Sequence, residues 1–333
     1  MTRVALLGYG LAGRVLHRPL LLAEPRLSVT HVVTGDPVRR AQVRQDLPEA
    51  ALCASADELW TRAAEFDAVV VATGGPTHGP LARAALRLGK AVVVDKPLAP
   101  TADEAASLLD EGGLLTVFQN RRWDSDTLTA ADLLVGGTLG EVGRLESRFT
   151  RFRPQVADRW REDPAAGGGV LLDLGSHVVD QALPLLGPVV DVYAELDVRR
   201  AGGAAEDDVF IALTHASGAR SHLWCSMTSP WQGPRLVLQG AAGGWSKQGL
   251  DGQEQAMRDG TTTAPEPDGL RWDTSGAHPV RSLPGDWQAF YRRFAAAVAG
   301  DGPLPVEPAD AVRTLRLLEA ARRSAADRQV IVV

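Results

Sequence analysis

The first 120 residues alternate short apolar runs with segments whose apolar residues recur at helical spacing. The apolar runs are rich in Val and lie at 4–7, 29–33, 68–71, 91–94 and 115–118. The helical segments lie at 12–23, 56–63, 80–88 and 102–109. Near-continuous apolar strands that alternate with helices are typical of a parallel sheet covered on both faces. The pattern predicts a doubly wound α/β domain of the Rossmann type over residues 1–120.

The pattern changes after Gln119. A helix is predicted at 125–135, a strand at 141–153, an apolar helix after 167, and successive strands at 189–198, 208–215, 220–226 and 235–239. Strands that follow strands imply a largely antiparallel sheet, so residues 121–333 are predicted to form an α+β domain. Terminal helices at 287–299 and 308–326 close the chain and could pack back on the first domain. The stretch 252–285, rich in Gly, Thr, Pro and Asp, is predicted to be a long loop.

Composition narrows the class of protein. The chain has 333 residues, is 45% hydrophobic and has a formal charge of -6, which suits two packed domains and offers no basic surface for nucleic acid. It shows no charged leader followed by a long apolar segment and no apolar run of membrane-spanning length, so a cytoplasmic location without membrane contact is expected. Cys53 and Cys225 are far apart and lack metal or redox spacing, which fits a reducing compartment.

A glycine motif, Gly8-Tyr9-Gly10-Leu11-Ala12-Gly13, follows the first strand and opens the first helix. In a dinucleotide-binding loop the first Gly makes the turn, the second admits the pyrophosphate, and the third lets helix and strand pack closely. The helix N-terminus then holds the phosphate charge. A purely structural Gly-rich turn is the alternative, but the strand before it and the helix after it favour a nicotinamide cofactor.

The end of the second strand carries conflicting signals about the cofactor's ribose. Asp36 would favour the free 2′-hydroxyl of NAD, whereas Thr34 with Arg39 or Arg40 would favour the 2′-phosphate of NADP. We expect NADP, with Thr34 and Arg39 as contacts, and NAD remains possible. The alternative is that both arginines are ordinary solvated surface charges.

Lys96 stands in the tripeptide Asp95-Lys96-Pro97, directly after the apolar run at 91–94. Open α/β sheets bind ligands at the carboxyl ends of their strands. Pro97 restricts Lys96 to extended conformations, so its ammonium has a defined direction and can hydrogen-bond a reacting oxygen. A surface lysine in a turn is the alternative, and the position at a strand end favours the functional role.

Asp173, His177 and Asp180 are spaced as one polar face of an otherwise apolar helix. His177 can take or give the proton of a carbinol, and Asp173 can orient it or hold the substrate hydroxyl. Asp180 is expected to be structural. A core helix whose polar residues satisfy nearby backbone is the alternative for all three. No metal-ligand motif is present, so no metal site is expected.

With these motifs in order and at the expected spacing, the chain resembles the glucose-fructose oxidoreductase and inositol dehydrogenase family, Gfo/Idh/MocA, over nearly its full length. The resemblance implies an N-terminal Rossmann domain and a C-terminal domain with an open, mostly antiparallel sheet that often forms dimer or tetramer contacts. It also implies a small-molecule substrate among sugars, cyclic polyols and related carbonyls. The expected assembly is therefore a homodimer or homotetramer.

The likeness is greatest to the branch of NADP-dependent scyllo-inositol dehydrogenases. It is carried by the segments 93–97, 120–126, 151–156 and 158–162. The resemblance implies that Lys96, Asp173 and His177 form the catalytic set and that all three contact the substrate, with Lys96 also touching the cofactor. It places Trp160 and Arg161 near the cofactor. It also implies substrate contacts from residues where the two domains meet, for which interdomain packing is the alternative: Asn120, Arg122 and Trp123.

The chain departs from the family at two places. Asp95 replaces the more common Glu. In Ala72-Thr73-Gly74-Gly75-Pro76-Thr77-His78, two glycines stand where relatives more often show Pro-Asn, so only Thr73 and His78 carry over as cofactor contacts. His78 could equally be a structural residue at a helix N-terminus.

The expected activity is hydride transfer between a nicotinamide cofactor and a secondary alcohol or ketone of an inositol-like polyol or a sugar. Two alternatives stay open from the sequence. One is a cofactor-holding sensor or regulator on the same fold. The other is an enzyme that uses tightly bound NAD transiently for elimination or hydrolysis.

Overall fold

The computed structural model describes residues 1–157, 162–164, 167–263 and 265–333. The chain divides into two compact units. Unit 1 comprises residues 1–120, 254–262 and 287–312, and unit 2 comprises residues 121–253, 263–286 and 313–333. No helix in the described part of the chain is long and apolar enough to cross a membrane.

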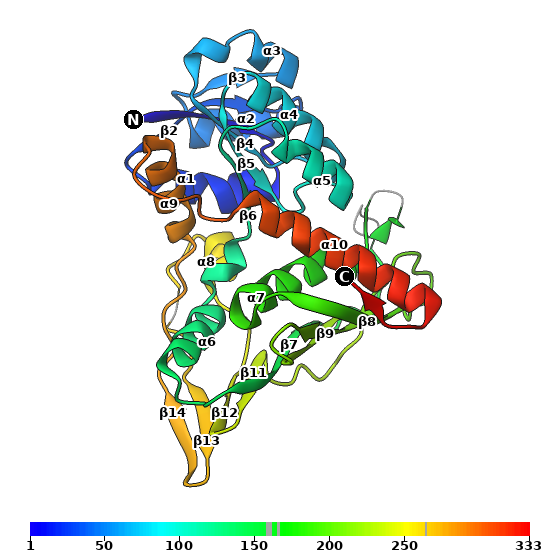
Figure 1. Ribbon diagram of the computed structural model, residues 1–333. Helices are drawn as coiled ribbons and strands as arrows, with labels where there is room; N and C mark the ends of the chain where they lie inside the picture. Colours follow the sequence, from blue (N-terminus) through cyan, green and yellow to red (C-terminus); the bar gives the residue numbers. More distant parts are fainter. Residues whose placement is uncertain (158–161, 165–166, 264) are drawn as a thin grey trace. The chain divides into compact units, whose positions relative to one another are not determined.

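Unit 1 is built on a six-stranded parallel sheet with strand order β3-β2-β1-β4-β5-β6 (Figure 1). The strands are β1 (Thr2–Leu7), β2 (Leu27–Val33), β3 (Ala51–Cys53), β4 (Ala68–Val71), β5 (Ala91–Asp95) and β6 (Leu115–Phe118). Every residue of β4 and β6 is buried, as expected for strands covered on both faces. The predicted Rossmann fold is confirmed. The strand order reverses direction between β1 and β4, and sheets of this kind bind ligands at that point.

Helices of unit 1 follow the strands in alternation. They are η1 (Ala12–His17), α1 (Arg18–Leu22), α2 (Pro37–Asp46), α3 (Ala56–Trp60), η2 (Ala63–Glu65), η3 (Gly75–Thr77), α4 (His78–Arg87), α5 (Ala102–Leu109) and α9 (Gln288–Ala299). The short strand β3 was not predicted, because only three residues form it. The first predicted helix is divided, since η1 is π-helical and only α1 is a regular α-helix.

Unit 2 contains a nine-stranded sheet of order β14-β13-β12-β11-β7-β10-β9-β8-β15. Its strands are β7 (Val142–Thr150), β8 (Val189–Asp197), β9 (Asp208–His215), β10 (Arg220–Ser226), β11 (Leu236–Gly240), β12 (Gly243–Lys247), β13 (Gly269–Asp273), β14 (Gly276–Val280) and β15 (Ile331–Val332). Every pairing is antiparallel except that of β7 with β10, so the predicted mostly antiparallel sheet is confirmed.

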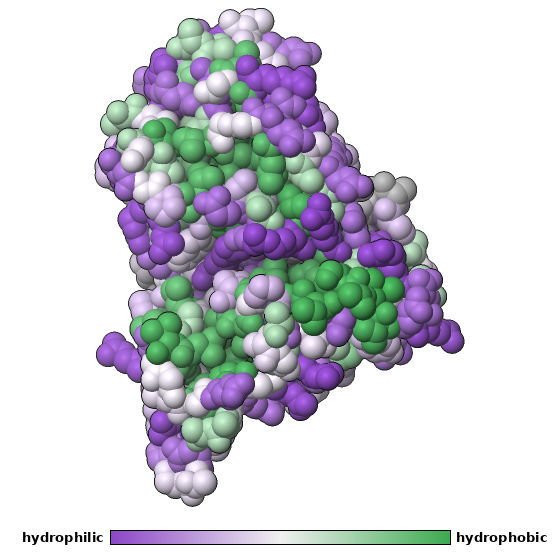
Figure 2. All heavy atoms as spheres, viewed as in Figure 1, coloured by the Kyte–Doolittle hydropathy of each residue, from purple (hydrophilic) through white to green (hydrophobic). Residues whose placement is uncertain are grey.

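The helices around this sheet are η4 (Asn120–Trp123), α6 (Ser125–Gly136), η7 (Leu171–Gly175), α7 (Ser176–Leu186) and α10 (Pro308–Asp327). Gly175 packs against Leu171 and Leu318, which brings α10 onto the start of α7 (Figure 1). Hydrophobic residues also gather at the surface of unit 2 near β15 and the C-terminus (Figure 2). Val190, Val330, Val332 and Val333 are exposed there.

The prediction of a long loop over 252–285 was wrong. The stretch contains α8 (Gln253–Asp259) and the hairpin of β13 and β14, which extends the sheet of unit 2. Gly269 lies so close to the buried Trp245 indole that any side chain there would overlap it. The Gly and Pro content that suggested a loop thus partly reflects close packing of a strand.

Candidate active site

The glycine loop between β1 and η1 has the backbone geometry that its sequence requires. Gly8 has φ +96° and lies against the carbonyl of Ala72, so that a side chain there would overlap the end of β4. A side chain on Gly13 would overlap the Gly8 carbonyl oxygen. Gly10, by contrast, has only the Arg39 guanidinium nearby, at 3.8 Å from an added Cβ. The first and third glycines are needed for packing, and the second leaves the backbone open to a ligand.

Tyr9 does not present its side chain to a ligand. It is buried, and its hydroxyl donates to Asp46 over 3.0 Å. Burial, followed by the hydrogen bond to Asp46, raises the pKa of Tyr9 to about 12. Arg14 and Arg18 also pair with Asp46. Tyr9 can therefore contact a cofactor only through its backbone, whereas Leu11 is exposed and Ala12 is half-buried.

Asp36 is the N-cap of α2. Its Oδ1 accepts hydrogen bonds from the backbone N–H groups of Val38 and Arg39 over 2.8 and 3.0 Å. The carboxylate is therefore already engaged near where NAD-specific proteins use an acid on the ribose. Arg39 extends across Gly10, while Thr34 is buried at the end of β2 and accepts from Arg40 through its carbonyl. Of these four residues, Arg39 is the one that reaches the glycine loop.

His78, the first residue of α4, fixes the loop after β4 through contacts of its ring. Its buried ring places Nδ1 2.6 Å from the Pro97 carbonyl oxygen and Nε2 3.1 Å from that of Thr73. Thr73 Oγ1 lies 2.7 Å from Thr77 Oγ1. Both ring nitrogens of His78 thus face protein carbonyls, which makes it a link between the loops after β4 and β5. A Cβ on Gly74 or Gly75 would meet nothing within 4 Å.

Lys96 follows β5 in unit 1, half-buried, with a cis bond to Pro97. Its backbone N–H donates to Asp95 Oδ1 over 2.8 Å. Asp95, before Lys96, accepts this hydrogen bond, and Pro97, after Lys96, contacts His78 through its carbonyl oxygen. The backbone of Lys96 is therefore fixed from both sides.

Asp173 and His177 belong to unit 2, and the helix that carries them differs from the predicted α-helix. Asp173 lies in the π-helical segment η7, and His177 is the second residue of α7. The wider π turn changes the simple four-residue geometry, and π turns often occur at functional sites. Asp173 is half-buried. His177 is 7% exposed, with its ring centroid 6.2 Å from that of Phe149.

Asp180 has a defined partner. Its two oxygens accept from Arg122 Nε and Nη2 over 2.9 and 2.7 Å, and the carboxylate is almost fully buried. This bidentate pair links η4 to α7 and accounts for Asp180 as a structural residue. Trp123 and Asn120 are buried. Trp160 and Arg161, expected near the cofactor, lie outside the described residues.

Sequence reasoning missed a buried polar network beneath His177. Arg121 pairs with Asp124, Arg235 pairs with Asp126, and both guanidinium groups lie over the Phe149 ring at 4.8 and 5.8 Å. Gln181 donates to Thr127 and accepts from Arg235, which connects α7 to the network. The charged residues at 121–126 were visible in the sequence, but nothing in that segment indicated their partners in other elements.

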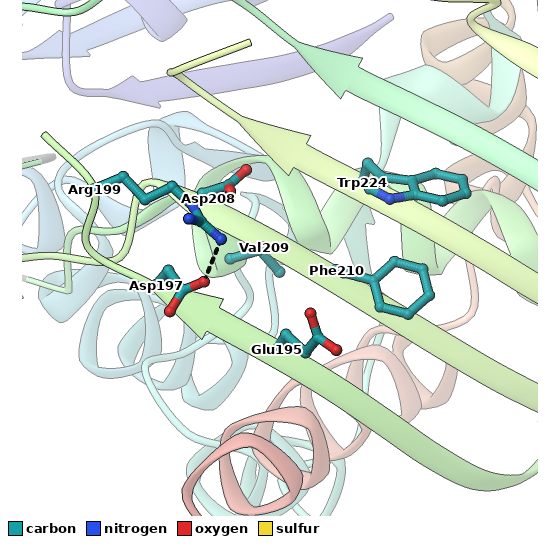
Figure 3. Close-up of a pocket in the computed structure, with 7 residues that line it drawn as sticks. All are labelled: Glu195, Asp197, Arg199, Asp208, Val209, Phe210 and Trp224. Atoms are coloured by element: carbon teal, nitrogen blue, oxygen red, sulfur yellow. Dashed lines mark hydrogen bonds and ion pairs between the residues drawn. The ribbon is translucent and has the colours of Figure 1, made fainter. Parts of the chain in front are cut away.

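A surface hollow in unit 2 contains none of these residues. It lies on β8, β9 and β10 and is lined by Glu195, Asp197, Arg199, Asp208, Val209, Phe210 and Trp224 (Figure 3). Arg199 pairs with both Asp197 and Asp208, and the carboxylates of the lining outnumber this one guanidinium group, so the hollow keeps an excess of negative charge. Among the described residues, no group of three or more His, Cys, Asp or Glu side chains could hold a metal ion.

Comparison with known proteins covers both parts of the chain. A model of an oxidoreductase family with an NAD-binding Rossmann fold, GFO_IDH_MocA, matches residues 2–111, and one of the GFO/IDH/MocA C-terminal domain matches residues 127–246. The chain is 36% identical to the uncharacterized oxidoreductase YdgJ of Escherichia coli K12, over 99% of this chain and 98% of YdgJ.

Two further similarities extend over the full length. The scyllo-inositol 2-dehydrogenase (NADP(+)) IolW of Bacillus subtilis is 31% identical over 99% of this chain and 96% of IolW. The solved structure of the putative oxidoreductase yvaA from Bacillus subtilis superposes with a TM-score of 0.93 and 31% identity, covering 100% of this chain and 98% of that one.

Proposed function

Because the chain belongs to the Gfo/Idh/MocA family of NAD(P)-binding oxidoreductases, we propose that it transfers a hydride between NADP and a secondary alcohol or ketone of an inositol-like polyol or a sugar. The observation that carries this proposal is the backbone-fixed Lys96 turn after β5, at the same edge of the sheet as a glycine loop open at Gly10 after β1. The full-length similarity to a scyllo-inositol dehydrogenase supports the substrate class.

The residues present fit a nicotinamide dinucleotide. Gly8 and Gly13 shape a loop whose backbone at Gly10 is accessible, and the π-helical η1 begins directly after it. The glycine loop would hold the pyrophosphate, Arg39 would face the 2′-phosphate of the ribose, and Thr73 with the Gly74-Gly75 backbone would line the nicotinamide side. When bound, the cofactor supplies the group that accepts or donates the hydride.

Three side chains would supply proton transfer, stabilisation of the reacting oxygen and orientation of the substrate. His177 takes the hydroxyl proton when the alcohol is oxidised and returns it when the ketone is reduced. Lys96 donates a hydrogen bond to the reacting oxygen and stabilises the negative charge that develops on it. Asp173 orients His177 or binds a neighbouring hydroxyl of the substrate.

A panel of inositols, inososes, sugars and keto-sugars, assayed with both cofactors in both directions, tests the activity. We expect NADPH consumption with at least one ketone of this class. Cofactor that stays bound and returns to its starting redox state after product formation would contradict net hydride transfer. No turnover with any member of the panel would contradict the substrate class.

Arg39 is proposed to bind the 2′-phosphate of NADP, since Asp36 is engaged as the helix cap. Replacing Arg39 with Ala should lower kcat/KM for NADPH by about 10- to 100-fold, because a hydrogen bond to a charged group contributes about 1.5–3 kcal/mol. The value for NADH should stay within about twofold, because NADH has no 2′-phosphate. Steady-state kinetics with both cofactors measure this. Arg44→Ala, an exposed arginine on the same helix, is the control, and an equal loss with NADH would argue against the assignment.

We also propose that the protein is a homodimer or homotetramer assembled through one face of the unit 2 sheet. Strand register places Phe210, His222 and Trp224 together on this face, with Arg148 4.0 Å from the Trp224 ring. Figure 3 shows Phe210 and Trp224 side by side on neighbouring strands. Partly exposed aromatic and arginine side chains are typical of protein interfaces.

Light scattering should therefore give a mass of at least twice 35.4 kDa. Trp224→Asp should shift the population toward the monomer, because it places a charge in an apolar contact. Val135→Asp, at a residue 91% exposed on α6, should leave the mass unchanged. A monomeric mass for the unchanged protein would contradict the proposal.

A further inference from the structure

His17 is a fully buried titratable residue that the proposed reaction does not use. It is the last residue of η1, the helix that starts from the glycine loop, and it is 0% exposed. Its Nδ1 lies 2.6 Å from the hydroxyl oxygen of Tyr291 on α9, which is also fully buried. Both residues belong to unit 1, and 274 positions of sequence separate them.

The strand register links His17 to the turn that carries Lys96. The His17 ring centroid lies 4.3 Å from that of Phe118, and Phe118 is the partner of Asp95 across β5 and β6. Partners in adjacent strands point to the same face of a sheet. His17, Phe118 and Asp95 therefore lie on one face, at the carboxyl ends of these strands. Asp95 in turn accepts the Lys96 backbone N–H over 2.8 Å.

The protonation states of His17 and Tyr291 follow from their burial. Burial lowers the pKa of His17 to about 4, although the Asp95 carboxylate acts in the opposite direction, and His78 adds to the decrease. Burial also raises the pKa of Tyr291 well above its usual value, with Asp95 as a second cause. At neutral pH the pair is therefore a neutral imidazole and a protonated phenol.

Hydrogen-bond counting then selects one tautomer. If Tyr291 donates to Nδ1, the imidazole proton is on Nε2, which has no partner among the described residues. If Nδ1–H instead donated to Tyr291, both the phenol proton and the Nε2 lone pair would be left without described partners. A buried unmade hydrogen bond costs about 1–3 kcal/mol. The first arrangement is favoured, so Tyr291 sets the orientation of the His17 ring.

We propose that His17, oriented by Tyr291, is a positioning residue for Lys96. His17 packs against Phe118 on the face of the sheet that also carries the Asp95 side chain, and this packing keeps the end of β5 in place. The Asp95 carboxylate, which accepts the Lys96 backbone N–H, then fixes the position of the Lys96 backbone. The inference rests on the proposed function, since it takes Lys96 to act on the reacting oxygen.

A double-mutant cycle between Tyr291 and Lys96 tests this inference. Tyr291→Phe keeps the ring that packs against Phe118, Phe290 and Phe294 but removes the hydroxyl. It should lower kcat by about tenfold, the effect of one lost hydrogen bond, and leave KM for NADPH within about twofold. In a Lys96→Met background the same change should alter the residual kcat by less than about twofold, because the residue that it positions is gone.

Conservative rescue gives a second test. His17→Gln retains a side-chain acceptor for Tyr291 and should keep kcat within about threefold of the parent, whereas His17→Phe should lose about tenfold. Nitrogen-15 spectra of the imidazoles should show His17 protonated on Nε2 alone from pH 8 to about pH 5. Protonation on Nδ1 would overturn the assigned tautomer and, with it, the orienting role of Tyr291.

The cycle separates two kinds of failure. If Lys96→Met itself leaves kcat unchanged, the proposed role of Lys96 is wrong, and the positioning inference is wrong with it. If Lys96→Met is strongly impaired and Tyr291→Phe causes the same fold loss in both backgrounds, only the positioning inference is overturned. If Tyr291→Phe and His17→Phe lowered the melting temperature equally but left kcat unchanged, the His17–Tyr291 pair would be merely structural.

Discussion

Replacing His177 with Ala is expected to lower kcat by about 10²- to 10⁴-fold, the range over which a positioned general acid–base contributes. His177 is only 7% exposed, so protein groups rather than bulk solvent surround most of it. KM for NADPH should stay within about twofold, because the proposed cofactor contacts lie in other parts of the chain. Steady-state kinetics with a substrate identified from the polyol and keto-sugar panel measure both values.

Two variants make the His177 result interpretable. His177→Asn keeps a polar side chain but cannot transfer a proton near neutral pH, and it should be as impaired as His177→Ala. His278→Ala removes a partly exposed histidine that contacts Asp273 and Ser275, and it should retain full activity. A kcat within about threefold of the parent in both His177 variants would remove this residue from the mechanism.

Replacing Lys96 with Met is expected to lower kcat by about 10²- to 10³-fold, as when a single donor to a developing oxyanion is removed. Methionine preserves much of the side-chain length, while Asp95 and His78 continue to hold the turn. The loss should therefore arise from the missing ammonium group. Kinetics in both directions should show it, since the same oxygen is involved in oxidation and in reduction.

Lys90→Met is the matched control for this prediction. Lys90 also lies in unit 1, where its Nζ donates to the Phe66 carbonyl and stands 5.2 Å from the Phe66 ring. Its replacement should cost some stability but no turnover. If the two lysine variants had the same kcat, the ammonium of Lys96 would have no catalytic role.

The protein's architecture was largely predictable from local patterns. The apolar runs of residues 1–120 predicted five of the six strands of the parallel sheet, because a parallel sheet buried on both faces requires apolar strands, whereas the short strand β3 was missed. The two strands at Asp208–His215 and Arg220–Ser226 were also predicted with their observed bounds. By contrast, the β13–β14 hairpin was missed, because glycines required by packing resemble glycines of a loop.

The sequence alone determined where the chemical groups lie along the chain: a glycine loop after β1, a lysine after β5, and an acid and an imidazole on a later helix. Motif spacing is sufficient for this, since each motif depends on its own strand or helix. Only the tertiary structure decided how side chains are paired. It directed Tyr9 toward Asp46, engaged Asp36 as a helix cap, and joined Asp180 to Arg122.

The same distinction applies to the residues around Lys96. Nothing in the local sequence connects His17 with Tyr291 or His78 with Pro97. Yet His78 holds the turn that carries the lysine, and His17 packs on Phe118, the strand partner of Asp95. Such pairs form because a buried polar group must find a partner, and folding brings together partners that are far apart in sequence. Local periodicity records which residues become buried, whereas the identity of their partners is set by the packing of distant elements.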